Sequence, residues 1–62
     1  MWVVMDDGNA VENRTGDELY TDYIKGIVNV YRNEKKIAWF TNLPDARAFI
    51  KKTVEEMNSV AG

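Results

Sequence analysis

Six carboxylates are crowded into the first 24 residues, and they are the side chains of this chain with the clearest potential for chemistry. Two neighbouring carboxylates can act as general acid and general base when a deep, dry pocket shifts their pKa values. A chain of 62 residues has little room for such a pocket. Its glycines are isolated from one another and do not form the clustered motifs that bind phosphate groups. The sequence therefore predicts that the chain is not an enzyme.

The residue types that hold most metals and activate most nucleophiles are missing. The chain contains no histidine and no cysteine, and its single serine is Ser59. Tight zinc and copper sites use imidazole or thiolate ligands, and catalysis near neutral pH commonly uses histidine. The segment Asp6–Asn9 begins like an EF-hand calcium loop, but the position that requires glutamate holds Arg14. We therefore expect no metal site and no cofactor.

Length and composition predict one folded, soluble domain that spans residues 1–62. Apolar residues make up 45% of the chain and aromatic residues are spread along it, which argues against disorder. The longest apolar run, Trp2–Met5, is far too short to cross a membrane. No signal-peptide pattern is found, and the absence of cysteine fits a reducing compartment. We expect a cytoplasmic protein without a membrane partner.

The charged residues are divided along the chain. Residues 1–24 carry six acids against one base, whereas residues 25–62 carry seven bases against four acids. Gathered on one surface, the acids could dock a partner protein or imitate nucleic acid, although two solvated faces would show the same division. Tryptophan and tyrosine contribute strongly to protein interfaces. The candidate partner-binding residues are therefore Asp6, Asp7, Glu12, Asp17, Glu18, Asp22, Tyr31 and Trp39.

These features predict a small, non-catalytic binding or regulatory module that acts by protein–protein contact. By analogy of size and composition, it is of the inhibitor or adaptor kind that phages and mobile elements use against host machinery. The alternative is a nucleic-acid-binding module with a basic hairpin tip and a basic helix face, although the net charge of −2 argues against it. Its candidate residues are Arg32, Lys35, Lys36, Arg47, Lys51 and Lys52.

Local signals are strongest in the second half of the chain. Residues 27–31 and 36–41 are β-rich runs separated by a short polar segment, which is typical of a hairpin built on a type I turn. Apolar residues then recur at helical spacing and predict a long C-terminal helix over 43–58. Asn42 can cap this helix, and Asp45 completes the capping pattern.

The first half of the chain permits more than one interpretation. Residues 2–5 are predicted to form a strand, followed by a turn and then either a short strand at Ala10–Glu12 or a loop. A capping-box pattern and helical spacing favour a short helix over 17–25. The competing interpretation extends the hairpin strand backwards to Tyr23, with Gly26 as a bulge.

The predicted fold is α+β, a three-stranded and mainly antiparallel sheet with the long helix across one face. Both hairpin strands carry apolar residues on both faces, whereas a half-exposed antiparallel sheet alternates apolar with polar residues. Because one helix covers one face, the other face must be covered by segment 17–25 or by another chain. A homodimer, formed through this face or through edge strands, is a further expectation.

Overall fold

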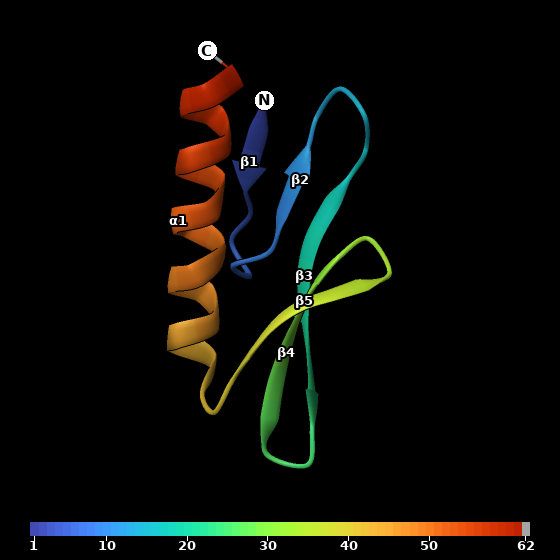
Figure 1. Ribbon diagram of the computed structural model, residues 1–62, viewed down its shortest axis with the longest axis vertical. Helices are drawn as coiled ribbons and strands as arrows, with labels where there is room; N and C mark the ends of the chain where they lie inside the picture. Colours follow the sequence, from blue (N-terminus) through green and yellow to red (C-terminus); the bar gives the residue numbers. More distant parts are fainter. Residues whose placement is uncertain (62) are drawn as a thin grey trace.

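The computed structural model describes residues 1–61 and has a small α+β fold, which confirms the expected class. Its strands are β1 (Trp2–Val4), β2 (Ala10–Glu12), β3 (Glu18–Ile24), β4 (Ile27–Arg32) and β5 (Lys35–Phe40), and its helix is α1 (Leu43–Ala61). Each strand pairs antiparallel with the next, which gives one sheet in the order β1-β2-β3-β4-β5 (Figure 1). The sheet thus has five strands where three were predicted.

Segment 17–25 is the main correction, because it forms β3 and not a short helix. β3 pairs with β4 over six residue pairs, from Leu19↔Arg32 to Ile24↔Ile27. A short helix rich in tyrosine, threonine and isoleucine has weak propensity and is marginal on its own. The extended segment instead gains a ladder of backbone hydrogen bonds against a strand of strong β-formers. Of the two interpretations of Ala10–Glu12, the strand is confirmed as β2.

The β3–β4 connection is a two-residue hairpin loop. Lys25 and Gly26 both have positive φ, 51° and 81°, as the tightest hairpin turns require, and Ile24 pairs directly with Ile27. The alternative of one continuous strand with a bulge at Gly26 is therefore wrong as well.

The predicted hairpin is confirmed as β4 and β5, but its loop is shorter than expected. Arg32 pairs with Lys35, which leaves Asn33 and Glu34 as the loop, with Asn33 at a φ of 55°. Asn33 also ties the hairpin tip to the start of β3. Its backbone N–H donates to the carbonyl of Glu18 at 2.9 Å, and its Oδ1 accepts the N–H of Glu18 at 3.0 Å.

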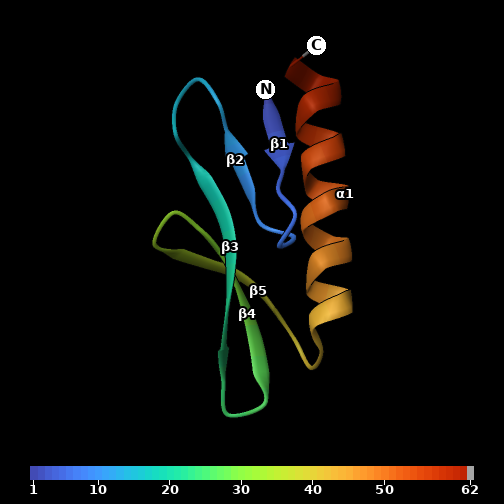
Figure 2. The same ribbon diagram turned by 180° about the vertical axis from the view of Figure 1, so that it is seen from behind.

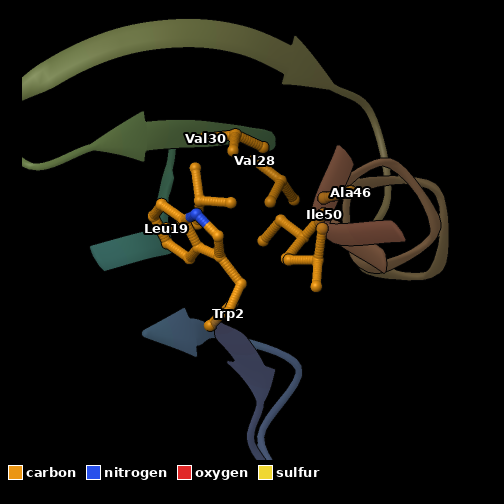
Figure 3. Close-up of a cluster of buried hydrophobic side chains, with 8 residues drawn as sticks. Trp2, Leu19, Val28, Val30, Ala46 and Ile50 are labelled. Carbon is orange, nitrogen blue, oxygen red and sulfur yellow. The ribbon is translucent and has the colours of Figure 1, made fainter. Parts of the chain in front are cut away.

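The helix begins as predicted and packs on one face of the sheet. Asn42 Oδ1 accepts the backbone N–H of Asp45 at 2.9 Å, and Asn42 Nδ2 donates to the Asp45 carboxylate at 3.0 Å. The helix extends to Ala61, three residues past the predicted end. Figure 3 shows its buried residues facing those of the strands. The core consists of Trp2, Ala10, Leu19, Val28, Val30, Ala46, Ile50 and Val54.

The helix also closes one edge of the sheet. The carboxamide of Asn58 accepts the backbone N–H of Trp2 at 2.9 Å and donates to the carbonyl of Trp2 at 3.0 Å. It therefore satisfies the edge of β1 as another strand would. At the other end of the molecule, the β3–β4 turn projects beyond the first turn of α1 (Figures 1 and 2).

Replacing Asn58 by alanine removes both hydrogen bonds and leaves two partly buried backbone groups of Trp2 without partners. We expect Asn58→Ala to lower the free energy of unfolding by about 1–3 kcal/mol in urea titrations. Ser59→Ala, at an exposed neighbouring position on the same helix, serves as the control. Equal stability of the two variants would contradict the edge-closing role of Asn58.

Lys25 occupies a left-handed conformation that asparagine adopts at lower cost. We expect Lys25→Asn to raise the free energy of unfolding by about 0.5–1 kcal/mol, because Asn-Gly is the preferred pair for this loop. The same change at exposed Lys52 in the helix should lower stability, since asparagine is a weaker helix former. A loss of stability in both variants would favour the helical interpretation of segment 17–25.

Candidate functional site

The face of the sheet opposite the helix carries the candidate site. In the register of the sheet, Asp22, Asn29 and Trp39 lie side by side across β3, β4 and β5. Tyr20, Tyr31 and Lys36 form the neighbouring row. Val28 and Val30 point into the core, so the residues that alternate with them point away from the helix. We call these two rows the outer face: Tyr20, Asp22, Asn29, Tyr31, Lys36 and Trp39.

Asn29 is the buried polar side chain of this face, with 7% of its surface exposed. Its Nδ2 donates to Oδ1 of Asp22 at 3.1 Å, so its own carbonyl oxygen is turned away from that carboxylate. Within residues 1–61 this Oδ1 has no hydrogen-bond partner. A buried acceptor without a donor costs about 1–3 kcal/mol. Asn29 is therefore an unfavourable residue for a strand that only needed packing.

Aromatic rings surround this polar pair. The rings of Tyr20 and Tyr31 stack with their centroids 5.5 Å apart and their planes 17° apart. Trp39, directly opposite Asn29, has 58% of its surface exposed. The pKa of Tyr31 is raised, first by desolvation of its hydroxyl and then by the negative charge of Asp22, whose carboxylate faces that hydroxyl. The phenol of Tyr31 therefore stays protonated to a higher pH than an ordinary tyrosine does.

A shallow hollow of about 440 Å³ continues the outer face toward the β4–β5 turn. It is lined by Glu18, Tyr20, Asn33 and Glu34. Tyr20 belongs to both the hollow and the outer face. Three carboxylates, those of Glu18, Asp22 and Glu34, thus accompany the aromatic rings, against one base, Lys36. This side of the molecule is acidic and rich in hydrogen-bond acceptors.

The six predicted acidic residues do not gather on one surface. Asp6 and Asp7 lie in the β1–β2 turn. Glu12 forms an ion pair at 2.8 Å with the amino group of Met1, which holds the pKa of Glu12 below its usual value. Asp17 pairs with Arg32 at 3.6 Å. Of the six, Glu18 and Asp22 belong to the acidic side described above, together with the predicted aromatic residues Tyr31 and Trp39.

The predicted basic residues are also separated. Arg32 lies over the ring of Trp2, 5.6 Å from its centroid, in addition to its ion pair with Asp17. Arg47 packs against the β1–β2 turn, where a Cβ on Gly8 would approach Arg47 Cγ to 2.7 Å. Lys51 and Lys52 are exposed on α1, whereas Lys35 and Lys36 lie at the β4–β5 hairpin. Figures 1 and 2 place the tip of that hairpin on the far side of the sheet from α1.

Sequence reasoning missed Asn29 and Tyr20. Asn29 is the polar residue within the otherwise apolar run 27–31, and a polar residue at the centre of a buried strand is a usable signal. Tyr20 was assigned to the predicted short helix. Only the pairing of β3 with β4 brings its ring onto that of Tyr31.

Comparison of the chain with protein-family models, with curated proteins and with solved structures found no significant match. Among residues 1–61, no group of three or more acidic side chains lies close enough together to hold a metal ion. No helix in this part of the chain has the length and hydrophobicity needed to span a membrane. The site is therefore interpreted from its own geometry.

The raised pKa of Tyr31 predicts an alkaline loss of stability. The pKa of Tyr31 in the folded chain exceeds the unfolded value of about 10. The contribution of Tyr31 to the free energy of unfolding should therefore be fully present below about pH 10 and be lost as the pH rises above it. We expect Tyr31→Phe to remove a step that lies above the usual tyrosine pKa from the absorbance titration at 295 nm. Asp22→Asn should shift that step to lower pH. An unchanged titration in Asp22→Asn would contradict the proximity of the two side chains.

Proposed function

We propose that the chain is a non-catalytic binding module that acts by contact with a partner protein through its outer face. The observation that carries this proposal is a buried, unpartnered acceptor at Asn29 beside the exposed ring of Trp39, on the face that the helix leaves open. Exposed aromatic residues around a polar centre are typical of protein interfaces, where aromatic side chains supply much of the binding energy.

The charges of this side of the molecule define the chemistry of the partner. The outer face and the adjoining hollow offer the carboxylates of Glu18, Asp22 and Glu34, and the buried carboxamide of Asn29 lies between Asp22 and Trp39. A complementary surface is basic and rich in N–H donors. An inhibitor or an adaptor is the role that fits a module with this surface, since binding alone would cover or bridge the basic surface of its partner.

A second copy of the chain is a poorer occupant of the outer face. Two such faces would bring the three carboxylates of one copy against those of the other, with a single lysine on each side. Like charges in contact oppose association. We therefore place the partner protein, and not a homodimer, on this face.

Nucleic-acid binding is the weaker alternative. It requires one continuous basic face, whereas Lys51 is exposed on α1, which packs on the core side of the sheet, and Lys36 lies on the outer face. Lys36 is accompanied by the carboxylates of Glu34 and Asp22, which would repel phosphate groups.

The proposed function predicts that Trp39 controls partner binding. The immobilised chain should capture a basic protein from cells of the source, and the purified pair should bind at least about tenfold more weakly when Trp39 is changed to alanine. Lys52→Ala, an exposed change on the far side of the helix, is the control. Amide-exchange protection of the complex should fall on β3, β4 and β5. Capture that is independent of Trp39, or salt-sensitive binding to DNA or RNA, would contradict the proposal.

A further inference from the structure

We infer that the outer face is a socket for one arginine side chain of the partner. In this arrangement the guanidinium stacks on Trp39 and donates to Asn29 Oδ1 and to the carboxylate of Asp22. The inference rests on the proposed function, because it specifies which group of the basic partner enters the face. Asp22, Asn29 and Trp39 occupy one row across three neighbouring strands, so a single side chain laid across this row would lie over all three.

The unpartnered oxygen of Asn29 calls for a donor from outside the chain. Its Nδ2 already donates to Asp22, and this bond orients the carboxamide so that the oxygen is turned away from β3. Trp39 is the neighbour of Asn29 on the opposite strand, β5. This oxygen is covered in the free chain, so an arginine that stacks on the exposed Trp39 ring must shift the side chains around the oxygen before it donates to it and relieves the cost of its burial.

Asp22 supplies the negative charge. Its Oδ1 accepts from Asn29, and the carboxylate also faces the hydroxyl of Tyr31. Within residues 1–61 Asp22 forms no ion pair. A cation that binds beside Asp22 would therefore neutralise its charge without displacing an ion-pair partner within the chain.

Arginine fits this row better than lysine does. The guanidinium is planar and carries five N–H donors, so it can stack on an indole ring while it donates to two acceptors at its edge. An ammonium group is compact and cannot stack in that way. The acidic hollow lined by Glu18 and Glu34 lies beyond the neighbouring row of Tyr20 and Tyr31, toward the β4–β5 turn, and would accept further basic residues of the same segment.

Lys36 is the internal competitor. It lies on the same face, opposite Tyr31 in the neighbouring row, and is exposed. Its positive charge weakens the potential that an incoming arginine meets. Removal of this charge in Lys36→Ala should strengthen arginine binding, whereas loss of Lys52 on the helix should leave it unchanged.

The test is a titration of the ¹⁵N-labelled full chain with Gly-Arg-Gly peptides blocked at both ends, with the matching Gly-Lys-Gly peptide as comparison. We expect saturable shifts of the Asn29 side-chain amide and of the Trp39 indole N–H. Binding of the arginine peptide should be stronger by roughly tenfold, the value of one charge-assisted hydrogen bond. Asp22→Asn and Trp39→Leu should each weaken it by a similar factor. Glu55→Gln, which removes the same charge from the exposed side of α1, is the matched control.

Equal affinity for the two peptides, or full retention of arginine binding in both Asp22→Asn and Trp39→Leu, would overturn the arginine socket. The proposed function fails separately. Partner binding that is lost in Trp39→Ala but unchanged in Asp22→Asn would leave the outer face as the interface and exclude arginine from the row. Partner binding that survives both changes would show that the outer face is not the interface.

Discussion

The constraint on which the structure depends is that one helix must bury a five-stranded sheet. The stripe formed by Ala46, Ile50 and Val54 packs in one core with Leu19, the valines of β4, Trp2 and Ala10, and this core supplies most of the hydrophobic burial. Within residues 1–61 there is no second helix to cover the opposite face. The outer face is therefore held by its own side chains, through the Tyr20–Tyr31 stack and the bond between Asp22 and Asn29.

Because the core lies on one side of the sheet, the outer face is the side that is free to contact a partner. On the covered face, the positions that meet the helix are buried and packed, which leaves them little freedom for recognition. On the outer face, by contrast, an asparagine occupies the middle of β4, where a β-branched residue would pack better and leave no unsatisfied acceptor. A residue that lowers stability in this way is better explained by a role in binding than by a role in folding.

The parts of the fold that the sequence predicts are those encoded within a few neighbouring residues. The β4–β5 hairpin and the Asn42 cap of α1 depend on local turn and capping chemistry, and both are confirmed. Segment 17–25 was mispredicted because its local signals favour a helix, whereas its partner strand decides the outcome. Tyr31 and Trp39 were identified from residue type alone, but Asn29 and Tyr20 acquire meaning only through the register of the sheet.

The amino-acid sequence by itself determined that the chain lacks histidine and cysteine, and its pattern of spacing predicted one long amphipathic helix after a hairpin. Both are properties of residue type and short-range spacing. The tertiary structure alone decided which charges lie together, since the acids and bases that the sequence groups by position are divided among turns, strands and helix. It placed Asp22, Asn29 and Trp39, up to 17 residues apart in the chain, in a single row, because strand pairing and not sequence distance sets which side chains meet.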